Sequence, residues 1–527
     1  MHKEIRMISV LALLALFLCP GFAVQEKLRD RRTVIDPEKT HTTDDPRRIP
    51  VPEGTFGAKG VLVLTGGRIF DGTGSAPIRE TLIIKDNEIA EICSPGSKKW
   101  PSEARVIDVS GKTVMPGLID LHTHLSYTEP DVPVELASNE ADATLRAMER
   151  LRFFIESGIT SIRDVGSLGD VPFRIKEWAA RNRLPGPRVF AAGRFITGTG
   201  GHGAEGMSPS HPLFGGTRTA SGPDDWREAV REEFNRGADL IKIGSHFSRD
   251  EIKAAVDEAH TLGLKVAVDA ETFYIQWAVE AGADTIEHPL PRTGETIRLM
   301  ARKGTQAVPT LVPYIYIFDL FGGYYGSTSR RFTFSKKANM DVVRKMKAEG
   351  VKMGIGTDLV MGWFRFLPGA YITELKQFVK AGYTVSEVLM TATKTNAEIL
   401  DMDDKLGTLE PGKLADVIVI DGAPDSDLDD LASLDIVIRD GYVVVENGRV
   451  VIPPIAQNLN LSPEAWGINP ASSEKAGMLA VDLAMRSSKS GMRVHGGFPC
   501  EGRKNVNNRD EIIRSKGRGQ DKGCFFL

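Results

Sequence analysis

The sequence predicts an α/β protein, a (β/α)8 TIM barrel with a composite β-sandwich domain built from both flanks of the barrel. Two patterns support this prediction. The middle of the chain, residues 116–404, alternates short β-rich runs with helical stretches, which is typical of βα units that form a parallel sheet. The flanks, residues 60–115 and 405–453, consist of short strand-like runs separated by turn residues, which indicates antiparallel strands. Two strand-rich pieces around one long insert therefore predict a single sandwich made from both flanks.

Ahead of these domains, residues 1–23 indicate a secretory signal peptide. Lys3 and Arg6 precede an apolar run at residues 7–18, which is too short to span a membrane, and small residues stand near a cleavage position at Ala23. Residues 24–59 are charged and rich in proline, so we expect a linker there. The sequence thus predicts an exported protein, periplasmic or secreted, with no stable membrane insertion after the signal is cleaved.

The individual strands follow from the apolar runs. In the flanks these runs are residues 61–64, 68–70, 81–84, 89–92, 106–109, 417–420, 436–439 and 442–446. The middle segment has eight, the number that a closed barrel needs: residues 118–124, 160–164, 188–192, 240–244, 265–269, 285–288, 306–310 and 353–357. The helices between them have ordinary signals. Residues 249–262, for example, follow Ser248 as an N-cap and stop at Gly263.

Composition limits the classes of partner. The formal net charge of -4 gives no basic field, so we expect a small-molecule substrate and no nucleic acid, and homo-oligomer formation stays open. Cys19 leaves with the signal, and the other three of the four cysteines are too scattered for a disulfide framework or a zinc-thiolate site. Residues 454–527 lack strand patterns, and we expect a poorly ordered tail without an assigned function.

Polar residues gather at the predicted strand ends, where barrels of this kind place their catalytic groups. Residues two apart in a strand point to the same face, so His122 and His124 would aim both imidazoles at one point, as a pair of metal ligands must. Lys242 lies in the fourth strand, and the fifth, sixth and eighth strands end at or just before Asp269, His288 and Asp358. These side chains would converge on one mouth of the barrel.

Each of these residues also has a plain structural interpretation. A His-x-His pair can be two ordinary strand histidines. Lys242 sits among apolar residues, where burying a lone ammonium is costly, so it could extend to the surface instead. His288 could be a structural histidine, and Asp358 could cap the helix that follows it.

The flanking residues decide between these interpretations. Pro116-Gly117 followed by an apolar run that ends in His122-Thr123-His124 resembles the entry strand of the amidohydrolase superfamily, and the glycine-rich loop at residues 196–203 is similar to one in its imidazolonepropionase-like and prolidase-like branch. The resemblance covers about residues 61–451.

The resemblance implies a metal centre at the mouth of the barrel. In it His122, His124, His288 and Asp358 are metal ligands, Lys242 reacts with carbon dioxide to become a carbamate that bridges two ions, and His202 contacts the substrate. For His202 a role in stabilising its own loop is the alternative. We expect a divalent metal, Zn²⁺ first and Mn²⁺ second, as one or two ions.

Asp269 departs from the pattern, because the resembled family has a histidine ligand of the second metal at this position. A carboxylate also ligates zinc, and it suits harder ions such as manganese or magnesium better than imidazole does. The second ion could thus be held differently, be a harder ion, or be missing.

The resulting expectation for function is a metal-dependent amidohydrolase that cleaves an amide or peptide-like C–N bond of a small molecule, with prolidase-like dipeptides favoured. Metal coordination lowers the pKa of bound water from about 15.7 toward roughly 7, and Asp358 would act as general base and then acid. Two alternatives stay open: a cyclic amide hydrolase of the imidazolonepropionase type, and a non-catalytic binding protein on the same scaffold.

Overall fold

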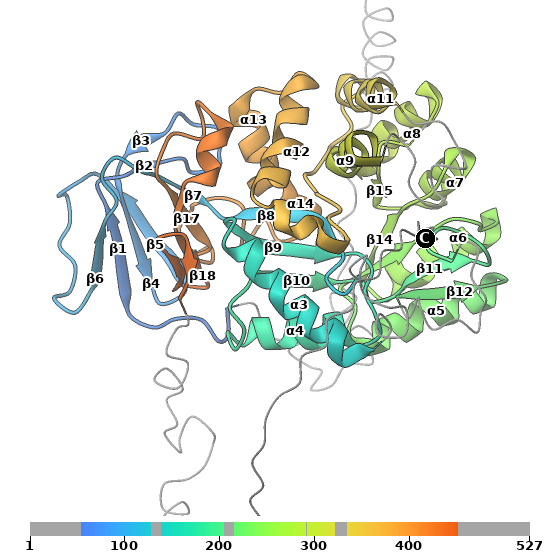
Figure 1. Cartoon of the computed structure of the whole chain (residues 1–527), viewed down its shortest axis with the longest axis horizontal. Coiled ribbons are helices and arrows are strands. Elements are labelled where there is room, and N and C mark those ends of the chain that lie inside the picture. Colours follow the sequence, from blue (N-terminus) through green and yellow to red (C-terminus); the bar gives the residue numbers. More distant parts are fainter. Residues whose placement is uncertain (1–53, 128–138, 205–215, 291, 322–334, 452–527) are drawn as a thin grey trace, which may run out of the picture. The chain divides into compact units, whose positions relative to one another are not determined.

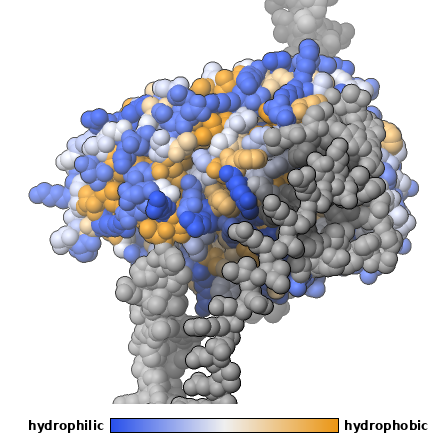
Figure 2. Space-filling view, in the orientation of Figure 1, coloured by the Kyte–Doolittle hydropathy of each residue, from blue (hydrophilic) through white to orange (hydrophobic). Residues whose placement is uncertain are grey.

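The computed structural model describes residues 54–127, 139–204, 216–290, 292–321 and 335–451. The predicted signal peptide (1–23), most of the predicted linker (24–59) and the predicted tail (454–527) lie outside these residues. In the described part of the chain, no helix combines the length and the apolar character that crossing a membrane requires. Figure 2 shows hydrophobic residues scattered among hydrophilic ones on the face that it displays.

The barrel wall consists of parallel strands, as predicted. Seven of them are β8 (Leu118–Thr123), β9 (Ile159–Asp164), β10 (Arg188–Ala191), β13 (Leu240–Ile243), β14 (Lys265–Val268), β15 (Thr285–Glu287) and β16 (Gln306–Val308). Parallel ladders join β8 to β9 and β9 to β10, and another series runs from β13 through β14 and β15 to β16. A backbone hydrogen bond of 2.8 Å from Asp239 N to Ala191 O connects the two series.

The eighth predicted strand, residues 353–357, closes the ring. On one side Gly354 N donates to Ala307 O at 2.8 Å, and on the other Leu121 N donates to Ile355 O at 3.0 Å. The segment pairs through isolated bridges, Met353 with Ala307 and Leu359 with Thr123, and not through a continuous ladder, yet it hydrogen-bonds to both neighbours. The predicted barrel is therefore confirmed, with seven regular strands and one extended segment.

Two strands of the barrel region were not predicted. β11 (Phe195–Gly198) and β12 (Thr217–Ala220) pair with each other in parallel, and β11 adds to the end of β13 at Ile196 and Ile243. The glycine-rich sequence that we expected to be wholly loop therefore begins as a strand, and the loop with His202 starts only after Gly198.

Helices cover the barrel between the strands. They are α3 (Glu140–Ile155), α4 (Val171–Ala180), α5 (Pro223–Arg236), α6 (Arg249–Thr261), α7 (Thr272–Ala281), α8 (Gly294–Lys303), α9 (Leu311–Phe321), α11 (Lys336–Ala348), α12 (Gly369–Lys380), α13 (Val385–Met390) and α14 (Asn396–Ile399). Short turns of other helical types are η3 (Met361–Phe366), η4 (Thr391–Thr395) and η5 (Leu428–Ala432). The predicted start of α6 is confirmed, because the Ser248 hydroxyl accepts a hydrogen bond from Glu251 N in a capping box.

Both flanks build the sandwich, which confirms the composite arrangement. One sheet contains β1 (Val61–Thr65), β4 (Thr81–Lys85), β5 (Glu88–Cys93) and β6 (Arg105–Asp108). The other contains β2 (Arg68–Ile69), β3 (Ile78–Arg79) and β7 (Thr113–Pro116) from the first flank, with β17 (Val417–Ile420), β18 (Leu434–Arg439), β19 (Tyr442–Glu446) and β20 (Arg449–Val450) from the second. Antiparallel pairing of β7 with β17 joins the flanks, and Figure 1 shows their blue and orange strands side by side.

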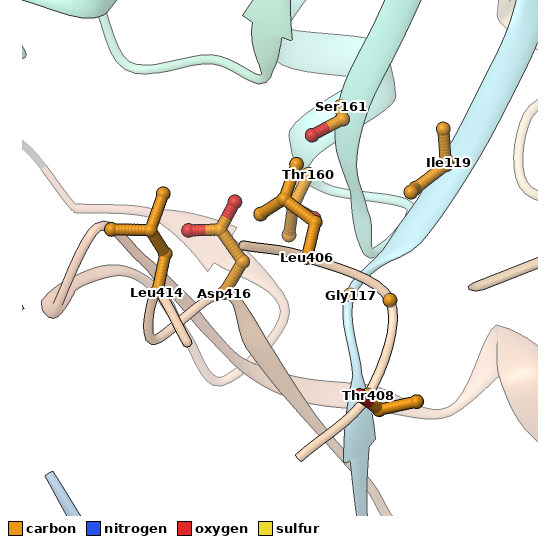
Figure 3. A pocket seen from close by; sticks show the side chains of 9 residues that line it. Gly117, Ile119, Thr160, Ser161, Leu406, Thr408, Leu414 and Asp416 are labelled. Carbon is orange, nitrogen blue, oxygen red and sulfur yellow. The ribbon is translucent and has the colours of Figure 1, made fainter. Parts of the chain in front are cut away.

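The sandwich meets the barrel where β7 runs into β8. A Cβ atom on Gly117 would lie 2.1 Å from Thr160 Oγ1, so this crossing requires glycine. Figure 3 shows Gly117 facing Thr160 and Ser161 of β9, with Leu406, Leu414 and Asp416 of the second flank close by. Beside it, the buried Arg188 guanidinium pairs with Asp416 at 3.1 Å. The Pro-Gly of the motif thus marks the junction between the two domains.

Candidate metal centre

Three residues at the strand ends, which lie at the mouth of the barrel, have unusual backbone conformations. His288, Thr310 and Asp358, which follow β15, β16 and the eighth segment, have φ values of +64°, +49° and +47°. Left-handed φ is uncommon for residues other than glycine and costs conformational energy, and such residues cluster at functional sites. Three of them at neighbouring strand ends indicate that the surrounding structure fixes these side chains.

Three predicted ligands meet at one point. Asp358 Oδ1 lies 3.2 Å from His124 Nε2 and 3.5 Å from His122 Nε2. Among the described residues these three make up the cluster whose ligand atoms all lie within 4.8 Å of one another. Both histidines are buried, whereas the Asp358 side chain is 18% exposed and reaches the mouth.

The hydrogen bonds of the two histidines suit a cation. His124 Nδ1 lies 2.9 Å from Gly166 O, which can only accept, so Nδ1 carries the hydrogen and Nε2 presents a lone pair. His122 Nδ1 likewise lies 2.8 Å from the carboxylate of Glu287. Without a cation, both lone pairs would face the Asp358 carboxylate. A divalent ion between them removes this conflict, and the outer hydrogen bonds are those that metal-bound histidines make.

Burial favours the neutral form of His122. It lowers the pKa of this imidazole well below its usual range, and the charges of Lys242 and His288 act in the same direction. Asp120, two residues earlier, accepts hydrogen bonds from His122 N and Thr357 N and ties β8 to the eighth segment. Burial raises the pKa of Asp120 to about 7.

A second group lies around Asp269. Its Oδ2 atom is 3.1 Å from His202 Nε2 and 3.2 Å from His288 Nε2. Burial alone would raise the pKa of Asp269, but the two imidazoles lower it well below the usual range. His288 Nδ1 contacts Thr310 Oγ1 at 2.6 Å and lies 3.9 Å from Asp358 Oδ2, so His288 stands between the two groups.

Lys242 lies inside the barrel, with 3% exposure, so it does not extend to the surface. Its Nζ atom is 3.5 Å from His122 Nε2. Among the described residues no carboxylate comes within 4.0 Å of it as an ion-pair partner. The capping alternative for Asp358 does not hold either, because Val360 is the N-cap of the next helical turn, η3. His202 contacts Asp269 through its ring, while its backbone N donates to Ser245 Oγ at 2.9 Å.

Sequence reasoning missed the residues that support the ligands. Glu287 contacts His122, Arg163 contacts Glu287, and Tyr127 stacks on His124 with ring centroids 4.3 Å apart. A signal was available, because Arg163 and Glu287 are charged residues in strands whose residues are all buried. Their partnership was not visible, since the strands lie far apart in the sequence.

Comparison with known proteins agrees with this geometry. The model of the amidohydrolase family matches residues 113–451. The chain is 26% identical over 425 residues to ochratoxinase from Aspergillus niger, covering 72% of this chain and 85% of that protein. It is 26% identical over 386 residues to imidazolonepropionase from Mesorhizobium japonicum, covering 66% and 86%. A solved prolidase complexed with N-methylphosphonate-L-proline gives a TM-score of 0.67 at 29% identity, covering 74% and 100%.

The family model spans more than half of the chain. The match covers 85% or more of each of these three relatives, and all three are hydrolases. The chain belongs to the amidohydrolase family and is a hydrolase that acts on carbon–nitrogen bonds.

Proposed function

We propose that this protein is a metal-dependent hydrolase of the amide bond of a small, dipeptide-like molecule. The observation that best supports the metal is the pair of ring nitrogens, His122 Nε2 and His124 Nε2, turned toward Asp358 by hydrogen bonds on the opposite side of each ring. A divalent ion held by His122, His124 and Asp358 would lower the pKa of a water molecule and polarise the scissile carbonyl.

Asp358 is the proposed proton carrier. One of its oxygens faces the two histidines, and its side chain is 18% exposed, so water can reach the carboxyl group. It would take a proton from the attacking water and donate it to the departing amine, as a general base and then a general acid. Its left-handed backbone and the hydrogen bond of 2.7 Å from Asp358 N to His122 O hold the carboxyl group in place for both steps.

We further propose that Asp269 and His288 would help to hold a second ion, and that Lys242 would supply a ligand as a carbamate. The buried position of Lys242, 3.5 Å from His122 Nε2, supports the carbamate. The carboxylate of Asp269 favours zinc or a harder ion such as Mn²⁺. His202, 32% exposed beside Asp269, is the proposed substrate contact.

The proposed substrate class is an amide whose amine part is an amino acid, as in dipeptides ending in proline. The likeness to a prolidase solved with a phosphonate derivative of proline supports it. The first 23 residues support a further proposal, that the enzyme is exported and meets such substrates outside the cytosol.

The test combines metal content with a substrate panel. The protein is purified without chelator, its zinc and manganese are measured by elemental analysis, and hydrolysis of Xaa-Pro dipeptides, other dipeptides, N-acyl amino acids and a cyclic imidazolone is followed. We expect one or two ions per chain and hydrolysis of dipeptides. A matched control is His260→Gln, which breaks a His–Asp pair of similar length, 2.9 Å to Asp284, outside the site.

The outcomes separate the alternatives. About two ions that fall to about one in Asp269→Ala would support Asp269 as a ligand of the second ion. Hydrolysis of the imidazolone alone would replace the dipeptide proposal. A chain that takes up no zinc or manganese, with no activity on any substrate, would overturn the proposed function.

A further inference from the structure

A buried pair of opposite charges lies inside the barrel, below the metal centre. Arg163 points inward from β9 and Glu287 from β15, and their side chains are 4% and 0% exposed. Arg163 Nη2 donates to both oxygens of Glu287, at 2.7 and 2.9 Å. The pair therefore joins two strands on different sides of the barrel interior.

The nitrogen atoms of Arg163 and the oxygen atoms of Glu287 all have partners. Arg163 Nε donates to Leu121 O, and Arg163 Nη1 donates to Thr285 Oγ1 at 3.3 Å. The Thr285 hydroxyl in turn donates to Glu287 Oε1 at 2.7 Å. A guanidinium carries a permanent positive charge, so it stabilises the carboxylate form of the neighbouring glutamate. Buried ion pairs of this kind add little net stability compared with apolar packing, so their value lies in the geometry that they fix.

The geometry in question is that of His122. Glu287 Oε2 is 2.8 Å from His122 Nδ1, while His122 Nε2, on the other side of the ring, faces Asp358. A carboxylate in this position keeps the hydrogen on Nδ1, orients the ring and increases electron density at Nε2.

We propose that Arg163 and Glu287 are positioning residues, which hold His122 in its metal-binding form and thereby raise the affinity of the centre for its first divalent ion. This inference rests on the metal site of the proposed function. His124 differs from His122, because its Nδ1 donates to a neutral backbone carbonyl, that of Gly166. The charged support is thus specific to one of the two histidines.

The test uses Glu287→Gln, which keeps the size of the side chain and removes its charge. Metal-free protein is titrated with Zn²⁺ against a chelator of known affinity, and the visible spectrum of Co²⁺-loaded protein is recorded. We expect the dissociation constant for Zn²⁺ to rise about 10- to 100-fold in this variant. The Co²⁺ spectrum should change as well, because the ring of His122 is no longer held.

Asp416→Asn is the matched control. It also neutralises the carboxylate of a buried arginine pair, Arg188 with Asp416, whose side chains are 3% and 4% exposed at the junction with the sandwich. Its thermal stability should fall as in Glu287→Gln, but its Zn²⁺ affinity should stay within about twofold of wild type and its Co²⁺ spectrum should not change. An equal loss of Zn²⁺ affinity in both variants would assign the effect to general destabilisation and overturn the proposal.

A second variant covers the case in which Glu287→Gln does not fold. The double change Arg163→Met with Glu287→Gln leaves no unpaired buried charge, so the barrel should tolerate it. Zn²⁺ binding as tight as wild type in either folded variant would overturn the inference while the proposed function stands. A wild-type chain that binds no Zn²⁺ would overturn both.

Discussion

Asp269, which the resemblance marks as a departure from the expected histidine, lies beside two imidazoles, those of His202 and His288. The sequence predicted the residues at the strand ends because the barrel rule depends only on where each strand ends. It could not predict the supports of the ligands. Glu287 and Arg163 meet only because β15 and β9 face each other across the barrel interior. The sequence of neither strand indicates that the other is its neighbour in the fold.

The proposed role of Asp358 gives a prediction for catalysis. Asp358→Asn keeps the shape of the side chain but cannot accept a proton, so we expect kcat for the best dipeptide to fall by about 10²- to 10⁴-fold. Steady-state kinetics with metal-loaded protein checks this, with His260→Gln as the control that should stay within about threefold of wild type. Retention of more than a tenth of the wild-type kcat would remove Asp358 from the proton transfer.

The depressed pKa of Asp269 gives a prediction for stability in the metal-free protein. The folded-state pKa lies below the unfolded value of about 3.9, so the carboxylate contributes stability that is present above pH 4 and is lost as the pH falls further. We expect Asp269→Asn to lower the free energy of unfolding by about 1.5–3 kcal/mol at pH 7. Urea denaturation of chelator-treated protein should show this difference shrinking below pH 4, and a difference that grows there would contradict it.

At the scale of elements, periodicity and capping residues were enough to predict α6 and most of the strands, but not the sandwich strands β3, β7 and β20. They were not enough for β11 and β12, because the glycine-rich sequence there forms strand only by pairing with the end of β13. Nor does the sequence around α9 show how that helix begins. Its first amides, Leu311 N and Val312 N, donate to the buried carboxyl of Glu374 on α12, at 2.9 and 2.7 Å.

This distant cap leads to a prediction for pH dependence. Burial raises the pKa of Glu374 to about 8, so between about pH 4.3 and 8 the folded state holds a proton that the unfolded state has released. Stability should therefore fall as the pH rises through this window. Glu374→Gln cannot ionise, so the fall between pH 5 and pH 8 in urea denaturation of metal-free protein should be smaller in the variant. An unchanged slope would show that Glu374 is already ionised in the folded protein over this range, so that its pKa is not raised.

At the scale of the whole molecule, the flanks make one sheet that neither could make alone. β7 pairs on one side with β2, from its own flank, and on the other with β17. The crossing at Gly117 then leads directly into β8, which contains His122 and is followed at once by His124. The composite sandwich was predictable, because strand patterns surround a barrel-like insert. The closeness of the crossing was not, because it depends on Thr160 of the next strand.

The shared sheet predicts a single cooperative unit. A chain that ends at residue 404 lacks β17 to β20, which leaves an edge of β7 unpaired and removes Asp416 from Arg188. We expect this truncated chain to be insoluble or rapidly digested by protease, whereas the full chain gives one thermal transition by calorimetry. A soluble, protease-resistant truncated barrel would show that the second flank is dispensable for folding.

The pairing of β7 with β17 also determines when the protein can finish folding. Met115 lies opposite Ile418, roughly 300 residues later in the chain. At a synthesis rate of about 5–20 residues per second, the first strand leaves the ribosome roughly 15–60 seconds before its partner. During that interval one edge of β7 is unpaired, and the second flank has not yet packed beside Gly117 at the end of the barrel. The sheet that starts in the first flank is thus completed only by the second flank, and the native state forms only once nearly all of the described chain has been synthesised.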